Sequence, residues 1–325
     1  MVMHAPQLNI PTPRQKPSIG TPPFSAPKPL AILELLKPVT WFPPMWAYLC
    51  GAVSAGLFAN FNSAGLHTDR LAYVIGGVVL AGPLVCGTSQ AVNDWFDRHV
   101  DAINEPDRVI PSGRMPGHWG LYVAVAGTLI SAAFAAMLGL WVFIATLFGL
   151  AAAWAYSAPP LRLKLNGWFG NGAVGFSYES LPWFTAAAAT LGFMPAWQSC
   201  MIALLYGFGA HGILTLNDFK AIKGDTELGV KSLPVQLGAT GAAWWTAFSM
   251  LSAQLAVIAL LLNWGKPTHA LIVSALVLAQ AALLFWFARK PIDRALGVSA
   301  FGVLLYVTGM MVTATALPAI TGLAQ

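Results

Sequence analysis

The chain has 325 residues, of which 57% are hydrophobic and only 9% are charged. Soluble globular domains carry about a quarter charged residues, so this composition excludes a soluble protein and indicates an integral membrane protein with several spans. The net charge of +5 is attributed to membrane topology, and nucleic-acid binding is not expected.

The first segment of the chain has no apolar core. Residues 1–30 are rich in proline and polar residues, which does not match a signal peptide and predicts a disordered cytoplasmic arm. Residues 31–325 are expected to form a single transmembrane domain. Cys50, Cys86 and Cys200 lie in apolar segments without metal-ligand spacing, so no disulfide framework is expected.

Nine apolar segments are long enough, at about 20 residues each, to cross a bilayer as helices. They lie near residues 40–59, 71–93, 117–136, 139–157, 169–189, 197–217, 241–262, 268–287 and 296–316. The chain is therefore expected to be an all-α membrane protein with nine transmembrane helices. With the N-terminus in the cytoplasm, 15 of the 17 Lys and Arg residues fall on the cytoplasmic side, as the positive-inside rule requires. The predicted topology is N-in and C-out.

Carboxylates follow the second apolar segment in the run Asn93-Asp94-Trp95-Phe96-Asp97-Arg98-His99-Val100-Asp101. On a helix, Asp94, Asp97 and Asp101 share one face, and Asn93 lies beside it. Three like charges on one face repel each other. A pair of Mg²⁺ ions bridging to a diphosphate would compensate this repulsion, because hard cations take oxygen ligands. All four residues are therefore candidate metal ligands, and Asp94 and Asp97 are also candidate catalytic residues.

Basic residues occupy the next two cytoplasmic loops. Arg108 and Arg114 lie in a loop whose two prolines and glycine predict a structured turn. Arg162 and Lys164 follow a Pro-Pro pair that ends the fourth segment. A guanidinium fork matches phosphate oxygens in a bidentate way, so these residues are candidate diphosphate ligands. For Arg162 and Lys164, a role as interfacial anchors explains the charge equally well.

A second acidic cluster follows the sixth apolar segment. Asp218 and Asp225 are seven residues apart, so they can face the same way on a helix, and Lys220 adds a charge that attracts phosphate. The two acidic clusters are four segments apart on the same predicted side of the membrane. This mirrored placement weakens the alternative of an ordinary polar loop. Asp218 and Asp225 are therefore candidate metal ligands, Asp225 is also a candidate catalytic residue, and Lys220 is a candidate diphosphate contact.

Three features inside the apolar segments have competing explanations. Gly170-Asn171-Gly172-Ala173-Val174-Gly175 matches G-x-G-x-x-G, but it opens a membrane span and follows no strand, so close helix packing is favoured over dinucleotide binding. His211 has no second intramembrane histidine at a useful spacing, which favours a buried packing role over metal or haem binding. Glu179 is a carboxylate inside a span, and such groups face a cavity or a partner.

The two acidic motifs resemble the signatures of the UbiA superfamily of intramembrane prenyltransferases. The resemblance covers residues 30–316, and nine spans match the architecture of that family. Within it, residues 40–48, 111–114 and 217–225 look like the branch of chlorophyll and bacteriochlorophyll synthases. Many members carry Asp-x-x-x-Asp in the second motif, whereas Ala221 holds the first of those positions here. This departure favours the tetrapyrrole branch over quinone-type ring prenylation.

The resemblance implies transfer of a C20 polyprenyl group, geranylgeranyl or phytyl, from its diphosphate to the propionate of a chlorophyllide, with bacteriochlorophyllide a preferred. It implies that Mg²⁺ is the cofactor, with two ions bridging to the diphosphate. Arg114, Lys164 and Lys220 would stabilise the departing diphosphate, and the apolar bundle would keep water from the prenyl chain.

The same resemblance extends to weaker expectations. Glu179, Trp46 and Tyr156 are candidate contacts of the acceptor or the prenyl tail. The expected location is the bacterial inner membrane, in its photosynthetic intracytoplasmic part, with the active site facing the cytoplasm and with partners in pigment assembly. The alternatives are a UbiA enzyme that prenylates an aromatic quinone precursor or haem, and a membrane transporter. A transporter predicts charges along an intramembrane pathway, whereas the acids here crowd one side.

Overall fold

The computed structural model describes residues 26–58 and 68–323. Within these ranges the chain is helical, and the extended backbone pairs only at one isolated bridge, between Asn166 and Lys231. Most of the arm expected at residues 1–30 lies outside the described residues, so its disorder stays a prediction.

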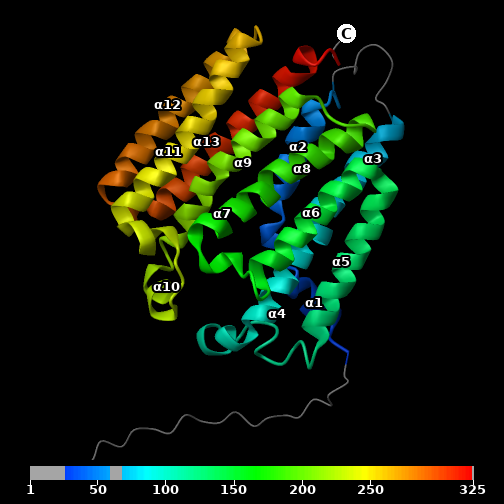
Figure 1. Ribbon diagram of the computed structural model, residues 1–325, viewed down its shortest axis with the longest axis vertical. Helices are drawn as coiled ribbons and strands as arrows, with labels where there is room; N and C mark the ends of the chain where they lie inside the picture. Colours follow the sequence, from blue (N-terminus) through cyan, green and yellow to red (C-terminus); the bar gives the residue numbers. More distant parts are fainter. Residues whose placement is uncertain (1–25, 59–67, 324–325) are drawn as a thin grey trace, which may run out of the picture.

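Thirteen α-helices make up the described bundle (Figure 1). They are α1 (Pro29–Leu35), α2 (Phe42–Ser54), α3 (Thr68–Val79), α4 (Gly87–Asn104), α5 (Trp119–Leu138), α6 (Leu140–Ser157), α7 (Gly167–Gly175), α8 (Leu181–Leu191), α9 (Trp197–Asp218), α10 (Ile222–Leu228), α11 (Leu233–Asn263), α12 (Pro267–Arg289) and α13 (Pro291–Ile320). Short 3₁₀ turns, η1 (Pro38–Thr40) and η3 (Leu163–Leu165), precede α2 and α7.

Seven helices in the described part are long and apolar enough to cross a membrane, and they match seven of the nine expected spans. The two remaining segments are helical but differ in kind. The segment near 40–59 forms α2, which has 13 residues, and the segment near 169–189 forms α7 and α8 with an interruption between them. The all-helical membrane fold is therefore confirmed, whereas the count of nine and the N-in, C-out orientation stay predictions.

Prolines and glycines set the boundaries of these helices. Proline occupies the first or second position of α2, α8, α11, α12 and α13, where its missing N–H leaves no helical hydrogen bond unmade. Gly139 has a φ of 132°, which a residue with a side chain rarely adopts. It therefore separates α5 from α6, and the closely spaced pair expected at 117–157 is two helices.

Two of the long helices contain a π-helical turn. The turn η2 (Leu80–Cys86) joins α3 to α4, and η4 (Phe176–Ser180) joins α7 to α8. Pro83 lies inside η2, and Pro182 follows η4 in the first turn of α8. Such turns shift the direction of the following side chains and are frequent at functional sites.

Tight packing accounts for the glycine motif at the start of α7. A Cβ on Gly175 would lie 2.7 Å from the carbonyl oxygen of Gly207 in α9, whereas a Cβ on Gly172 would meet only the edge of His211 at 3.9 Å. His211 is itself buried; its Nδ1 accepts from Trp245 Nε1 at 2.9 Å, and its Nε2 lies 3.2 Å from the Trp168 carbonyl. Both features have the packing roles expected of them.

We expect Gly175→Ala to destabilise the protein by about 1–3 kcal/mol, because the new methyl group would force α7 and α9 apart. The purified protein in detergent should lose several degrees of Tm. Gly172→Ala, three residues away on the same helix, is the matched control and should leave the Tm unchanged. Equal Tm values for the two variants would contradict the assignment of Gly175 to helix contact.

Candidate functional site

The polar loops lie at one end of the bundle, the end at which α1, the end of α4 and α10 are found (Figure 1). Helix α4 continues beyond the apolar segment, so Asp94, Asp97 and Asp101 all lie on its last turns. The sequence prediction that one helix carries these three carboxylates is confirmed.

Each of these aspartates has a basic partner from a different segment. Lys37 Nζ lies 2.6 Å from Asp94 Oδ1, and Arg108 contacts Asp101 at 3.0 Å and Asp94 at 3.5 Å. Lys164 pairs with Asp97, and Arg162 approaches it at 3.9 Å. The repulsion expected among the carboxylates is therefore offset by cations from the turn before α2 and from two loops.

Two of these cations occupy unusual backbone positions. Lys37 and Arg162 have φ values of 46° and 41°, and each immediately precedes a 3₁₀ turn, η1 and η3 respectively. Left-handed backbone at residues other than glycine costs about 1–3 kcal/mol and is concentrated at functional sites. Sequence reasoning missed Lys37 as a site residue, because the positive-inside rule already explains a lysine at this position.

Lys164 is the most deeply enclosed cation of the site, with 11% of its side chain exposed. Burial lowers the pKa of Lys164, because it disfavours the charged ammonium, and the hydrogen bond and negative charge of Asp97 oppose that shift. The ammonium is thus held against a carboxylate in a partly dehydrated place, where a phosphate oxygen would interact with it strongly.

The second acidic cluster has a different shape from the expected one. Helix α9 ends at Asp218, the chain turns, and Asp225 lies in the first turn of α10. The expectation that one helix presents both carboxylates is therefore wrong, because residues 219–221 break the helix. The carboxylates remain close enough for their charges to interact. Lys220 lies exposed in the turn between the two helices.

Asn171 fixes the orientation of Asp218. Its Nδ2 donates to Asp218 Oδ2 at 3.0 Å, and the amide is buried against α9. Asn171 belongs to the glycine motif, which was interpreted only through its glycines. No sequence pattern indicates that an amide one turn into α7 contacts a carboxylate at the end of α9.

The loops that carry the two halves of the site are joined by the isolated bridge. The Gly167 N–H donates to the Lys231 carbonyl at 2.7 Å, and the Lys231 N–H donates to the Leu165 carbonyl at 2.9 Å. A Cβ on Gly167 would lie 2.6 Å from the backbone nitrogen of Leu233. The bridge thus holds the Lys164 loop against the segment that follows Asp225.

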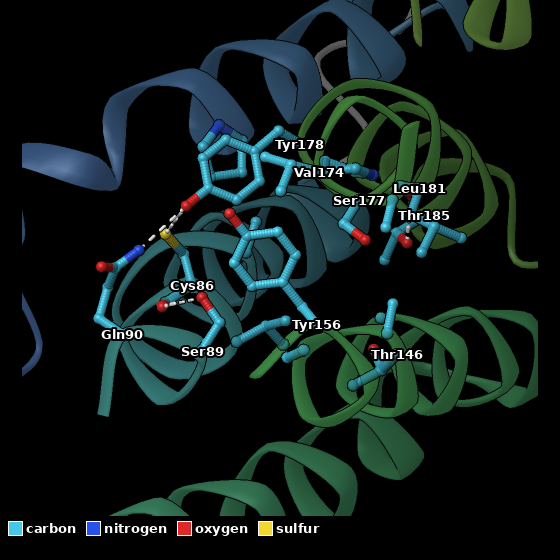
Figure 2. Close-up of a pocket in the computed structure, with 18 of the residues that line it drawn as sticks. Cys86, Ser89, Gln90, Thr146, Tyr156, Val174, Ser177, Tyr178, Leu181 and Thr185 are labelled. Carbon is cyan, nitrogen blue, oxygen red and sulfur yellow. Dashed lines mark hydrogen bonds between the residues drawn. The ribbon is translucent and has the colours of Figure 1, made fainter. Parts of the chain in front are cut away.

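A cavity of about 330 Å³ lies inside the bundle, where α6 and α8 face the two π-helical turns (Figure 2). The first residue of each acidic motif, Asn93 and Asn217, lies in its wall together with Tyr156. Asn93 and Asn217 immediately precede Asp94 and Asp218, so each acidic cluster begins beside the wall of the same cavity. Most of the remaining wall consists of Ala, Leu, Val and Pro side chains, which come mainly from η2, α6, α7 and α8.

Other predicted site residues lie elsewhere. Arg114 pairs with Glu34 of α1 and donates to the Asp107 carbonyl at 2.7 Å, so it ties the loop to α1. Glu179 is buried in η4, with no hydrogen-bond partner for its Oε2 among the described residues. Trp46 donates to the Val307 carbonyl at 3.0 Å. The proposed substrate contacts of Arg114, Glu179 and Trp46 stay predictions.

The side-chain donors of the site fit a Mg²⁺ ion that is shared with a bound substrate. Its side-chain donors are amide and carboxylate oxygens, which Mg²⁺ prefers. In the part of the chain that the structure describes, no three acidic, histidine or cysteine side chains converge closely enough to hold an ion by themselves. Mg²⁺ is usually bound through one or two carboxylates and substrate phosphates, so these acids fit an ion shared with a diphosphate.

The chain is similar to known proteins over nearly its whole length. Residues 42–308 match the model of the UbiA prenyltransferase family. The Bacteriochlorophyll synthase 33 kDa chain of Cereibacter sphaeroides is 54% identical, with 91% of this chain and 95% of the relative covered. The chloroplastic chlorophyll synthase of Arabidopsis thaliana is 38% identical, with 87% and 73% covered. The structure of a UbiA homolog from Archaeoglobus fulgidus bound to DMAPP and Mg²⁺ has a TM-score of 0.64 at 17% identity, covering 88% of this chain and 99% of that one.

Proposed function

Because the chain belongs to the UbiA prenyltransferase family, we propose that it transfers a C20 prenyl group from geranylgeranyl or phytyl diphosphate to the propionate of bacteriochlorophyllide a. The observation that carries this proposal is 54% identity to a bacteriochlorophyll synthase over almost the full length of both chains. The site supports it, because two acidic clusters and several cations border an apolar cavity.

The residues at the cavity mouth would hold the diphosphate. Mg²⁺ would be bound by oxygen donors from both acidic clusters: Asn93, Asp94, Asp97 and Asp101 in the first, and Asp218 and Asp225 in the second. When bound, Mg²⁺ neutralises the leaving diphosphate. Lys37, Arg108, Arg162 and Lys164 can turn from the carboxylates to phosphate oxygens, since each already lies at the site with its charge partly exposed.

The reaction needs little acid–base chemistry from the protein. The C–O bond between the prenyl C1 and the diphosphate breaks, and its electron pair leaves with the diphosphate. A propionate oxygen forms the new bond to C1, so the ester forms without a proton transfer. A carboxylate is already nucleophilic near neutral pH, and the protein supplies position, charge and exclusion of water.

The apolar part of the cavity would contain the reactive carbon and the start of the prenyl chain. Its walls are lined by small and aliphatic side chains of α6, such as Ala145, Gly149 and Ala153, and by Leu181 and Pro182 of α8. Such a lining keeps water from the developing positive charge on C1.

The proposal includes the setting of the enzyme. The chain is an integral membrane protein. We assign it to the bacterial inner membrane, with nine spans and with the diphosphate site on the cytoplasmic side. The concentration of basic residues in the loops at that end supports this orientation.

A direct assay tests the function. Membranes that contain the protein should esterify bacteriochlorophyllide a when supplied with geranylgeranyl diphosphate and Mg²⁺, and chelation should abolish the product. Competition between bacteriochlorophyllide and chlorophyllide, compared as kcat/KM, should favour the former. Equal kcat/KM values for the two pigments would contradict the assignment of bacteriochlorophyllide as the acceptor but not the proposed prenyl transfer. A prenylated quinone precursor in place of an ester would overturn the proposed function.

A further inference from the structure

One corner of the cavity wall is polar although its residues belong to neither acidic cluster. Cys86, Gln90 and Tyr178 form this polar corner, in which the Cys86 thiol and the Gln90 amide both contact the Tyr178 hydroxyl (Figure 2). Two other hydroxyl groups in the wall bond to the backbone: Ser89 donates to the Cys86 carbonyl and Thr185 to the Leu181 carbonyl. The hydroxyl of Ser177, next to Tyr178 in the same wall, has no partner among the described residues. The unfilled hydrogen-bonding capacity of the wall therefore lies beside the polar corner.

The hydroxyl of Tyr178 is the centre of the polar corner. It accepts a hydrogen bond from Gln90 Nε2 at 3.1 Å and lies 3.4 Å from the Cys86 thiol, whose single hydrogen can go either to this hydroxyl or to the Thr40 carbonyl, also at 3.4 Å. Among the described residues, no oxygen or nitrogen accepts the hydrogen of this hydroxyl, and the sulfur of Cys86 is only a weak acceptor for it. An enclosed donor without a strong acceptor costs free energy, so an oxygen on a bound ligand would be held there.

The two π-helical turns bring the corner together. Cys86 is the last residue of η2, and Tyr178 is the third residue of η4. Each turn carries an extra residue relative to an α-helix, which changes the direction of the side chains beside it. The meeting of η2 and η4 at the cavity is thus a structural basis for a ligand contact.

The depth of the polar corner indicates which ligand it meets. Gln90 and Cys86 precede Asp94 by four and eight residues, which places them about 6 and about 12 Å along the helix from the start of the acidic face, at about 1.5 Å per residue. The diphosphate charges stay at the acidic face, and a prenyl chain has no hydrogen-bond acceptor. A flat macrocycle whose propionate reaches the reactive carbon is broad enough to place a peripheral oxygen at this depth.

We propose that Tyr178 donates a hydrogen bond to a carbonyl oxygen on the periphery of the acceptor macrocycle, with Gln90 fixing the direction of the hydroxyl. The contact would orient the macrocycle so that its propionate faces the prenyl C1. This inference rests on the proposed function. Two carbonyl groups of bacteriochlorophyllide a have the required chemistry, the acetyl group and the ketone of the fifth ring.

The test is Tyr178→Phe, which removes only the hydroxyl oxygen and its hydrogen. We expect the KM for bacteriochlorophyllide a, and its Kd measured by pigment fluorescence, to rise about tenfold, the effect of losing one hydrogen bond of about 1.4 kcal/mol. The kcat and the KM for the diphosphate should change little. Gln90→Leu should give a smaller rise in the same two acceptor constants. Tyr122→Phe, on the exposed side of α5, is the matched control.

Modified pigments identify the carbonyl and separate positioning from structure. One acceptor has vinyl in place of acetyl, and another has the fifth-ring ketone reduced. Wild type and Tyr178→Phe should differ little on the pigment that lacks the contacted carbonyl, and should differ about tenfold on the other pigment. An equal loss on every pigment, or no loss on any, would overturn the inference. Selective pigment binding without ester formation would instead retain the inference and overturn the proposed function.

Discussion

Asp97→Ala is expected to lower kcat/KM for the prenyl diphosphate by on the order of a hundredfold to a thousandfold, the scale of removing one preorganised charge contact at a reacting group. Asp97 lies at the centre of the acidic face and holds Lys164, the most enclosed cation of the site. Its removal takes away a proposed metal ligand and also leaves an enclosed ammonium without its counter-charge. The measurement is steady-state turnover of purified enzyme at saturating Mg²⁺.

The control for this variant is Asp293→Ala, which removes an exposed carboxylate from the first turn of α13. It should retain full activity. Both proteins should insert, because neither change removes apolar packing. The unpaired Lys164 ammonium should lower the Tm of Asp97→Ala, so turnover is compared per folded protein at a temperature below both transitions. Near-normal turnover of Asp97→Ala at saturating Mg²⁺ would remove the metal assignment.

Lys37→Met is expected to lower kcat/KM for the diphosphate by about tenfold to a hundredfold, with an increase in its KM as part of the effect. The ammonium lies 2.6 Å from Asp94, whose side chain is only 6% exposed. Without Lys37, the site loses a cation that can contact phosphate, and within residues 26–58 and 68–323 Asp94 keeps only the longer contact with Arg108. Loss of a buried charge partner has effects of this size.

Lys28→Met tests whether any lysine in this segment has the same effect, since Lys28 is exposed just before α1. It should behave as wild type. Lys37→Arg should recover part of the lost activity, because the charge is restored on a longer side chain. An unchanged KM for the diphosphate in Lys37→Met would show that Lys37 only compensates Asp94 and does not contact the donor.

Much of the fold could be predicted because hydropathy and charge act on whole segments. The long helices from α5 to α13 coincide with apolar runs that a bilayer requires. The segments that became α2 and α7–α8 were harder to predict. Helix α2 ends at Ser54, before Gly56 with its φ of 85°, and the π-helical turn η4 interrupts the other segment before Pro182. Hydropathy also contains no sign of a π-helical turn.

The site could be predicted where its residues share one helix. The spacing of Asp94, Asp97 and Asp101 was sufficient, because helical periodicity fixes their common face. The contacts of Lys37 with Asp94 and of Asn171 with Asp218 join segments 57 and 47 residues apart, and no local period encodes such contacts. Arg114 was predicted to contact the diphosphate because it lies close in sequence to the three aspartates of α4, but its guanidinium pairs with Glu34 of α1.

In the substrate-free site, basic side chains already neutralise the carboxylates of the acidic face. Asp94, Asp97 and Asp101 supply three negative charges, and Lys37, Arg108 and Lys164 supply three positive charges in direct contact with them. A free cation would have to displace these side chains and would leave them without counter-ions. A cation that enters together with a diphosphate gives the displaced side chains new anionic partners. Affinity for each component is then raised by the other, and thermodynamic reciprocity makes the two increases equal.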